Sequence, residues 1–189
     1  MARNIGVLAL QGDFDRHKTA LKKAGANVVE IRMPEQLRGC DGLIIPGGES
    51  TTLTKLMSLY HFYEPIINFA KKYPIMGTCA GLIMLSSEVN DEKVKPLKLI
   101  NIKTSRNAYG RQIDSFIAPI EFNGIGSKSF DAYFIRAPKI EKIGNGVNIL
   151  SKYKDSPIAV SNENILVMSF HPELGKDFRI HKIFIENFC

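Results

Sequence analysis

The sequence has no tryptophan, only three cysteines and no long apolar run. A helix that spans a bilayer needs about 20 apolar residues, so none is expected, and the opening residues also lack the apolar stretch of a secretory signal. Cys40, Cys79 and Cys189 are odd in number and far apart in the chain. They argue against a disulfide framework and predict a reducing compartment, with the cytoplasm as the expected location. Because no pair has CxxC spacing, a structural zinc site is not expected either.

A concentration of charge of one sign is also missing, although the net charge is +6. Lysine and arginine are scattered, with doublets only at Lys22-Lys23 and Lys71-Lys72. Without a recognised nucleic-acid motif, this pattern favours a solvated basic surface, or one that meets an acidic partner, over nucleic-acid binding. The composition, 44% hydrophobic and 23% charged, is that of a globular protein, and the length predicts one domain over residues 1–189.

In the first half, apolar runs of strand length alternate with stretches of helix length. Strands are expected over residues 4–10, 27–31, 42–46 and 75–76, and helices over 13–24 and 51–72. The second helix is expected to break at Pro65. This order predicts an α/β fold of the flavodoxin-like three-layer type, with a largely parallel central sheet and helices on both faces.

The second half has a different texture. After a polar loop over residues 90–98, shorter strands are expected over 99–104, 116–122, 131–135, 148–152, 158–161 and 165–170. Because no linker separates the halves, these strands are expected to add to the same sheet, largely antiparallel. A final amphipathic helix is expected over residues 177–188, with Phe178, His181, Ile185 and Phe188 facing inward.

Two glycines flank a cysteine at the end of the fourth expected strand. The segment 77–81 (GTCAG) has the pattern of a nucleophile elbow with Cys79 in place of serine, in which small neighbours permit a sharp strand-to-helix turn. The turn also places the thiol at the positive end of a helix, which favours the thiolate. Taken alone, Cys79 is better explained as a packing residue. The flanking glycines and a histidine partner favour a nucleophile.

A second glycine-containing turn follows the third expected strand. Gly47-Gly48 precede Glu49 and Ser50, and such a loop of exposed amides can hold a phosphate, a carboxylate or an oxyanion. It is not a P-loop, because the spacing and the lysine of that motif are missing. Gln11, Gly47-Gly48 and Cys79 all follow expected strands. Sites in parallel sheets gather at the carboxyl ends of strands, so these residues are expected to lie together.

A histidine and a carboxylate follow the last expected strand. Residues two apart in an extended chain face the same side, so His171 and Glu173 can lie together. A carboxylate that orients an imidazole, which in turn activates a thiol, is the arrangement of a nucleophilic triad. The remaining histidines lack such a pattern. We interpret His17 as a helix-face residue, His61 as structural, and His181 as a core or surface residue.

Two segments place arginines in or beside loops, at 106–111 (RNAYGR) and 134–138 (FIRAP). The guanidinium fork can bind a carboxylate through two parallel hydrogen bonds, which makes Arg106 and Arg136 candidate substrate contacts. For either arginine alone, a solvated side chain is the simpler interpretation.

Together these motifs resemble those of the class I, or triad, glutamine amidotransferases. The GTCAG segment with His-Pro-Glu at 171–173 is typical of the broad class. The chain is more closely similar to the glutaminase subunits of pyridoxal 5′-phosphate synthases, and the matching segments span nearly its whole length. They are 8–12 (LALQG), 46–51 (PGGEST), 77–81, 106–112 (RNAYGRQ) with 114–116 (DSF), 134–138 and 169–173 (SFHPE).

The resemblance implies a glutaminase that forms a γ-glutamyl thioester on Cys79, with His171 as general base and acid and Glu173 holding its tautomer. It implies an oxyanion site at the backbone amides of Gly47, Gly48 and Ala80. Residues implied to hold glutamine are Gly47, Gly48, Glu49, Ser50, Arg106, Ile135 and Arg136. Ammonia would pass to a separate TIM-barrel synthase subunit in a large hetero-oligomer that makes pyridoxal 5′-phosphate, with Gln11 near the interface helping to activate the site. Neither a cofactor nor a metal is implied.

Several alternatives make different predictions. The glutaminase of another ammonia-channelling synthase, such as imidazole glycerol phosphate synthase, should lack the Arg106 and Phe134 segments. A non-catalytic structural subunit would show no thiol-dependent turnover. A cysteine peptidase or chaperone of a related fold would not need His-Pro-Glu on a terminal strand. A basic nucleic-acid binder would be retained on DNA in a salt-dependent way.

Overall fold

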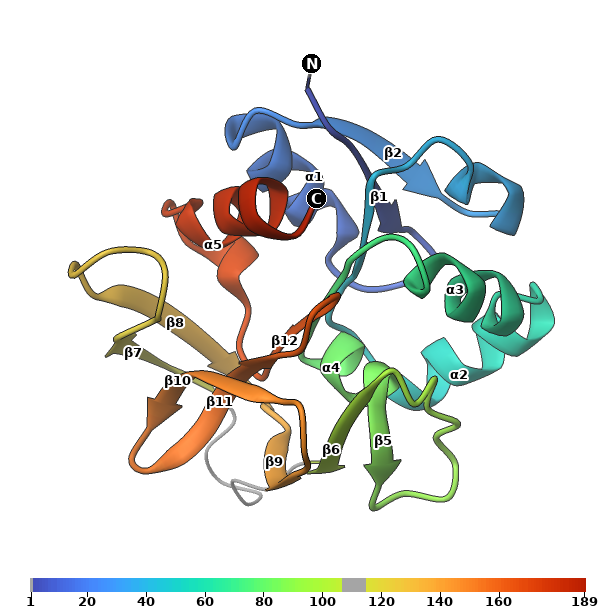
Figure 1. The fold of residues 1–189 in the computed structure, drawn as a ribbon. Helices are drawn as coiled ribbons and strands as arrows, with labels where there is room; N and C mark the ends of the chain where they lie inside the picture. The colour runs from blue at the N-terminus through green and yellow to red at the C-terminus, as the bar shows by residue number, and fades with distance from the viewer. Residues whose placement is uncertain (1, 107–114) are drawn as a thin grey trace.

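A seven-stranded sheet forms the centre of the protein, described here from a computed structural model over residues 2–106 and 115–189. The strand order is β10-β11-β12-β4-β3-β1-β2 (Figure 1). The five strands from β12 to β2 pair in parallel, whereas β11 and β10 are antiparallel. The sheet therefore confirms the expected α/β class. Its strands are β1 (Asn4–Leu8), β2 (Asn27–Ile31), β3 (Gly42–Ile45), β4 (Ile75–Thr78), β10 (Asn148–Tyr153), β11 (Ser156–Ser161) and β12 (Ile165–Met168).

Helices cover both faces of this sheet, because successive residues of its buried strands point to opposite sides. Ile44 and Met76 pack in one core with Leu21 and Ile180, from two of the helices. The neighbouring Leu43, Ile45 and Ile75 face a second core. The first face carries α1 (Phe14–Lys23) and α5 (Arg179–Ile183), and the second carries α2 (Ser50–Leu59), α3 (Tyr63–Ala70) and α4 (Ala80–Leu85).

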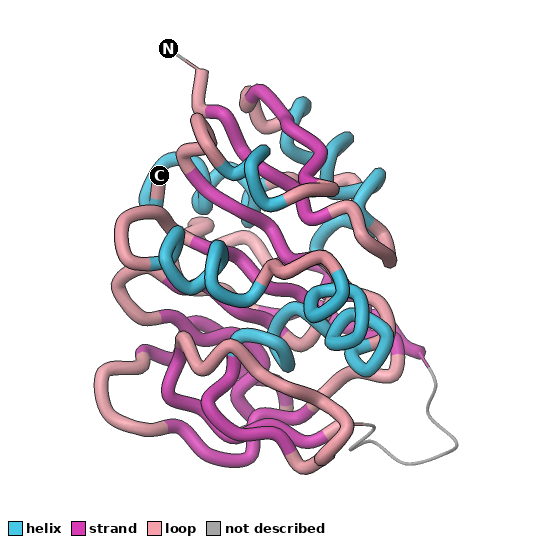
Figure 2. The backbone as a smooth tube through the Cα atoms, turned by 90° about the vertical axis from the view of Figure 1, so that its right-hand side faces the viewer, coloured by secondary structure: helices cyan, strands magenta, loops and turns pink. Residues whose placement is uncertain are grey.

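The second half of the chain corrects one expectation. Only β10 and β11 extend the central sheet as antiparallel strands, β12 joins it in parallel, and the strands from β5 to β9 form two smaller sheets. Figures 1 and 2 both show these strands gathered at the lower end of the molecule. One small sheet has the order β5-β6-β9, with β5 and β6 parallel, and the other is the β7-β8 hairpin. Their bounds are β5 (Ser86–Val89), β6 (Ile100–Ser105), β7 (Ser115–Ile120), β8 (Phe130–Ile135) and β9 (Lys139–Ile143).

The expected helix over residues 51–72 is broken earlier than Pro65. It divides into α2 and α3 at Tyr60–Phe62, where His61 has a positive φ of 57°. Pro65 is the third residue of α3. The N–H groups of a first turn have no acceptor within the helix, so proline is tolerated there.

The C-terminal helix is also less regular than expected. It consists of α5 followed by a π-helical turn, η3 (Phe184–Phe188). His181 is fully buried, as are Ile180 and Phe184, while Phe178 is half-buried. Because a π turn adds a residue, the inward face shifts along the helix relative to an α-helical pattern. Two short 3-10 helices complete the described elements, η1 (Pro34–Leu37) and η2 (Pro172–Leu174).

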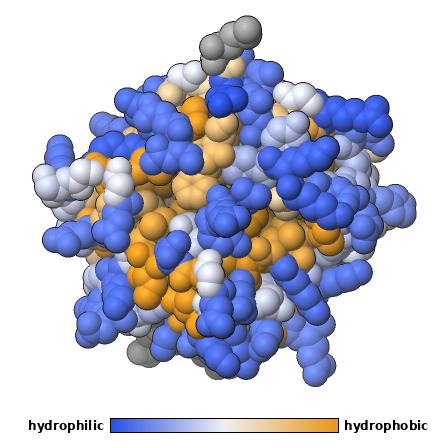
Figure 3. All heavy atoms as spheres, in the orientation of Figure 1, coloured by the Kyte–Doolittle hydropathy of each residue, from blue (hydrophilic) through white to orange (hydrophobic). Residues whose placement is uncertain are grey.

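The surface shows one apolar region in the view of Figure 3. Apolar residues gather near the centre of this face, over β11 and β12, and hydrophilic residues surround them. Among the described residues, no helix is long and apolar enough to cross a membrane.

Candidate active site

Cys79 lies at the sharp turn between β4 and α4. Its backbone has φ 49° and ψ −103°, a conformation that side chains other than glycine rarely adopt. The glycines beside it are required by close packing. A Cβ on Gly81 would lie 2.0 Å from the Ile45 carbonyl oxygen, and one on Gly77 would lie 2.6 Å from the Leu85 side chain. The turn therefore has the geometry of the expected elbow.

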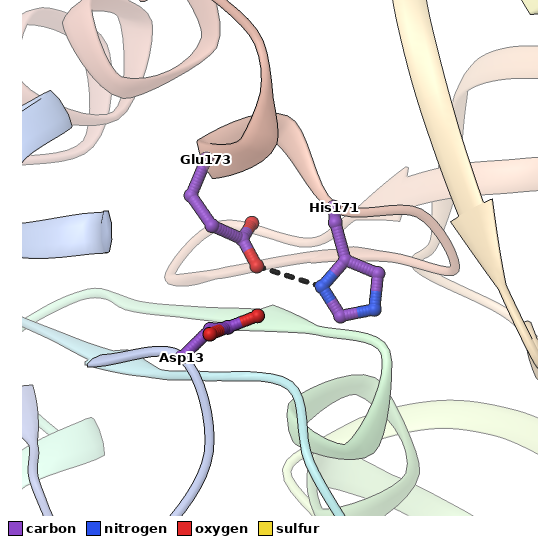
Figure 4. A group of neighbouring side chains, drawn as sticks. All are labelled: Asp13, His171 and Glu173. Carbon is purple, nitrogen blue, oxygen red and sulfur yellow. Dashed lines mark hydrogen bonds and ion pairs between the residues drawn. The ribbon is translucent and has the colours of Figure 1, made fainter. Parts of the chain in front are cut away.

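His171 and Glu173 follow β12, the neighbour of β4 in the sheet. The N–H of His171 donates to the Tyr133 carbonyl oxygen at 2.8 Å, which ties the residue to β8. Its Nδ1–H donates to Glu173 Oε1 at 2.7 Å, drawn as the dashed line in Figure 4. The imidazole and Cys79 line the same cavity, and their interaction raises the pKa of His171. The structure thus brings together the three residues that the sequence singles out.

The charges of this trio support one another. Burial lowers the pKa of His171, but its interactions with Cys79 and Glu173 outweigh burial and raise the pKa to about 10. Burial in turn raises the pKa of Glu173, but His17 and His171 outweigh it and lower the pKa to about 2. At neutral pH an imidazolium therefore lies between the thiol and an ionised carboxylate.

Asp13 lies below the His171–Glu173 pair in the view of Figure 4, at the start of α1. It holds the N-cap position of α1 but makes no side-chain capping bond. One ligand atom each from Asp13, His171 and Glu173 lies within 4.8 Å of the others, which is close enough for a metal ion. Figure 4 shows Nδ1 of His171 already bonded to the carboxylate. A cation there would compete with that bond, so the trio is better explained by orientation of His171.

A cavity of about 300 Å³ opens beside Cys79. All of the residues expected to bind substrate line it. Its walls are Gly12, Asp13, Gly47, Gly48, Glu49, Ser50, Cys79, Ile83, Arg106, Ile135, Arg136 and His171. Gln11, Ala80 and Glu173 lie behind this wall. The Ser50 hydroxyl is buried and has no hydrogen-bond partner among the described residues. It is therefore a polar group available to a ligand.

The Gly47-Gly48 loop forms one wall of the cavity, and close packing requires glycine at both positions. A Cβ on Gly47 would lie 2.4 Å from Cε1 of His171 and 3.3 Å from Cβ of Cys79. Gly48 has φ 152°, and a Cβ there would meet the Gln11 side chain at 2.4 Å. Gln11 accepts a hydrogen bond from the Glu49 N–H at 3.1 Å. The loop backbone can thus approach the thiol and histidine closely.

Glu49 and Arg106 form an ion pair at the mouth of the cavity. Arg106 Nη2 lies 2.5 Å from Glu49 Oε1, and its Nη1 lies 2.5 Å from Asp91 Oδ2. Glu49 also caps α2 by accepting a hydrogen bond from Thr52 N–H. Burial raises the pKa of Glu49, but bonds with Thr51 and Thr52 and the charge of Arg106 lower it overall. The mouth therefore holds one cation between two carboxylates. The remainder of the 106–112 segment lies outside the described residues.

Ile135 and Arg136 lie where β8 ends. The Ile135 carbonyl oxygen is 4.0 Å from Sγ of Cys79. Ile135 and Arg136 both have exposed side chains. Arg136 has a positive φ of 42°. The expected juxtaposition of these residues with Cys79 is therefore present.

Sequence patterns missed three residues that lie next to this site. His17 is fully buried and contacts Glu173, so its interpretation as a helix-face residue was incomplete. Asp91 comes from a loop expected only to be polar. Asp13 lies four residues before His17, and this spacing places two residues on the same side of a helix. That spacing is the signal that could have found Asp13. None of these three residues stands in a recognisable motif.

These geometric features agree with comparisons to known proteins. Residues 7–189 match the model of the SNO glutamine amidotransferase family, and the chain belongs to that family. A solved glutamine amidotransferase has a TM-score of 0.91 and 42% sequence identity, with 96% of this chain and 97% of that chain covered.

Two relatives carry a more specific name, pyridoxal 5′-phosphate synthase subunit PdxT. The protein of Thermosipho africanus is 50% identical, with 96% of each chain covered. That of Dehalococcoides mccartyi strain BAV1 is 52% identical, with 96% of this chain and 95% of the relative covered. A structure of PurLQS from Thermotoga maritima, at 18% identity and a TM-score of 0.68, shares the fold.

Proposed function

We propose that Cys79, His171 and Glu173 are the triad with which this glutamine amidotransferase hydrolyses L-glutamine to L-glutamate and ammonia. One observation carries the proposal. A histidine that is hydrogen-bonded to a buried carboxylate lines the same cavity as a thiol on a strained elbow. Acyl transfer from an amide needs these parts, because a nucleophile must be activated and the leaving nitrogen protonated.

The chemistry follows from this arrangement in two stages. Sγ of Cys79 attacks the side-chain carbonyl carbon of glutamine, and the carbonyl oxygen becomes an oxyanion. His171 gives its proton to the amide nitrogen, the C–N bond breaks, and ammonia leaves behind a γ-glutamyl thioester. His171, now neutral, takes a proton from water, and the resulting hydroxide releases glutamate. Glu173 keeps the Nδ1 proton in place throughout, so that Nε2 faces the reaction.

The walls of the cavity supply the remaining contacts. Backbone N–H groups of Gly47, Gly48 and Ala80 stabilise the oxyanion, as donors preorganised beside the nucleophile. The substrate contacts proposed are Gly47, Gly48, Glu49, Ser50, Arg106, Ile135 and Arg136. Glutamine carries an ammonium and a carboxylate, and Glu49 and Arg106 offer the complementary charges. The free Ser50 hydroxyl can bind the same polar end of the substrate.

The ammonia serves pyridoxal 5′-phosphate synthesis, as the relatives' name supports. We propose that it passes to a separate synthase subunit of TIM-barrel fold in a large hetero-oligomer. Gln11 lies behind the Gly47-Gly48 loop, where a partner could act on the oxyanion site through it. All three cysteines are free, which supports a reducing location such as the cytoplasm. The chain as a whole is proposed to be one amidotransferase domain.

The test is glutamate release from glutamine by the chain alone and with a matching synthase subunit, beside Cys79→Ala. We expect activity that rises with the partner and disappears in the variant. Activity without a partner effect would retain the glutaminase and contradict the vitamin B6 assignment. No activity in a folded, assembled complex would contradict the catalytic role and favour a structural subunit.

A further inference from the structure

A second histidine contacts the far side of Glu173. Nε2 of His17, from α1, lies 3.3 Å from Glu173 Oε2, and both side chains are fully buried. The same Nε2 lies 3.2 Å from Oγ1 of Thr78, the residue before Cys79. His17 therefore links the triad carboxylate to the strand that carries the nucleophile.

A third histidine lies behind the second. Nδ1 of His17 is 3.0 Å from Nε2 of His181, from α5, and the two rings are tilted 55° to each other. Both rings are completely buried. The polar contacts thus run from His181 through His17 and Glu173 to His171.

The order of these contacts fixes where the protons lie. Burial lowers the pKa of His17 and of His181, so both rings are neutral at pH 7. An ionised carboxylate only accepts hydrogen bonds, so the neutral His17 ring faces it favourably with Nε2 protonated. Its Nδ1 is then an acceptor, and His181 donates to it from Nε2. This leaves an unprotonated Nδ1 on His181, the atom that has no partner among the described residues.

Glu173 Oε2 needs a polar neighbour such as the His17 ring. It is buried and makes no hydrogen bond within the described part of the chain, so His17 is the polar ring that compensates its charge. A buried carboxylate without compensation would protonate or turn away. Either change would release His171 from its orientation.

We propose that His17, aligned by His181, is a positioning residue that keeps Glu173 ionised and directed at His171. The inference rests on the proposed triad and extends it by two imidazoles on the side away from substrate. Neither His17 nor His181 lines the cavity. Their effect should therefore fall on kcat, with little change in the KM for glutamine.

The test compares substitutions that keep or remove a donor at the Nε2 position. Glutamine places its amide near Nε2 of histidine, asparagine places it near Nδ1, and leucine has no donor. We expect His17→Leu and His17→Asn to lower kcat by about ten- to a hundredfold. His17→Gln should recover most of that loss. His61→Leu, at an exposed histidine away from the site, is the matched control and should leave kcat unchanged.

A second readout does not depend on turnover. Iodoacetamide reacts with a thiolate, so the rate at which Cys79 is alkylated at pH 7 reports its pairing with His171. Mass spectrometry separates Cys79 from Cys40 and Cys189. The rate should fall in His17→Leu and be restored in His17→Gln, each with the thermal unfolding recorded to show that the variant is folded.

The outcomes separate this inference from the triad itself. If Cys79→Ala or Glu173→Gln retained full glutaminase activity, the triad would be wrong and the role of His17 with it. If both were inactive while all folded His17 variants kept kcat and Cys79 alkylation near the parent values, only the positioning role would be overturned. Equal losses in His17→Gln and His17→Leu would also overturn it, because a packing role predicts no recovery by a donor.

Discussion

At the residue scale, the proposed nucleophile is held in a conformation that its own side chain disfavours. Cys79 has φ 49° and ψ −103°, and the surrounding strand, helix and glycines fix that geometry. Strained backbone positions of this kind cost about 1–3 kcal/mol each and occur where a side chain must be aimed. The elbow therefore exchanges some stability for the exposure of the thiol to the cavity.

Replacing Cys79 by glycine should reveal that strain. Cys79→Gly and Cys79→Ala should both lack activity, but the glycine variant should be the more stable by about 1 kcal/mol, since glycine adopts this φ without strain. At an unstrained position the order would be reversed, because glycine gives the unfolded chain more freedom. Urea unfolding of both variants measures the difference. A Cys79→Ala protein that is equally or more stable would contradict the strain.

Sequence patterns single out Cys79, His171 and Glu173, the residues of the proposed triad, but not all of their surroundings. Cys79 and His171 stand in short local patterns, the flanking glycines and the His-Pro-Glu segment, which sequence inspection can recognise. The contact between His17 and His181 joins residues 164 positions apart and depends on the packing of α1 against α5. No local spacing encodes such a contact, so the second and third imidazoles could be found only in three dimensions.

At the element scale, the loop after β5 contributes to the mouth of the cavity through Asp91. This carboxylate and Glu49 hold Arg106 between them, which positions the guanidinium before substrate arrives. Asp91 does not line the cavity. Its influence on glutamine should therefore act through Arg106.

Substituting Asp91→Asn should raise the KM for glutamine several-fold and leave kcat within about twofold of the parent value, because the residue is remote from Cys79. The reason is that a charged partner of Arg106 becomes neutral while the side-chain volume is kept. Steady-state kinetics over a range of glutamine concentrations measures both constants. Glu88→Gln, whose carboxylate pairs with Lys103 on the small sheet, is a matched control. An unchanged KM in Asp91→Asn would contradict this role.

The packing of α5 on α1 should make the fold sensitive to acid. The pKa of His181 is lowered by burial from 6.5 to about 3 in the folded protein. Between these values the unfolded chain binds more protons, so the free energy of unfolding falls as the pH falls. His17 contributes with the same sign, and Glu173 adds to the loss below its ordinary pKa of 4.5.

A His181→Gln variant lacks one of these titrations. Its free energy of unfolding should decline less steeply than that of the parent between pH 6.5 and 4.5, by up to about 1.4 kcal/mol per pH unit. Glutamine retains a donor at the position of Nε2, so His17 keeps a partner. Urea unfolding at several pH values gives both slopes. Parallel curves for the two proteins would show that His181 titrates normally.

Sequence patterns predicted the parallel half of the fold better than the remainder. Apolar runs such as 42–46 are buried on both faces, and a central strand of a parallel sheet is the structure that such a run predicts. In contrast, β5 and β9 have only one buried residue each and no apolar run, so sequence patterns predict neither strand. Which sheet a strand joins depends on distant partners. Local patterns therefore place β6 and the β7-β8 hairpin in the central sheet, whereas in the structure they belong to the two smaller sheets.

At the scale of the whole molecule, the carboxyl ends of the parallel strands collect the chemistry. β1 leads to Gln11 and Asp13, β3 to the Gly47-Gly48 loop, β4 to Cys79, and β12 to His171. The β8 strand brings Ile135 to the same place from a separate sheet. Residues from the two halves of the chain thus meet at one cavity. This arrangement explains why the family motifs are spread over nearly the full length of the sequence.

The most direct measurement of the central claim is covalent labelling by a glutamine analogue with a diazoketone in place of the side-chain amide. Such a group alkylates the thiol that attacks it, and the assembled complex with the synthase subunit is the sample. Mass spectrometry should find one adduct, on the peptide that contains Cys79, and excess glutamine should slow its formation. Labelling of Cys40 or Cys189 instead, or labelling of Cys79 that glutamine does not slow, would contradict the account.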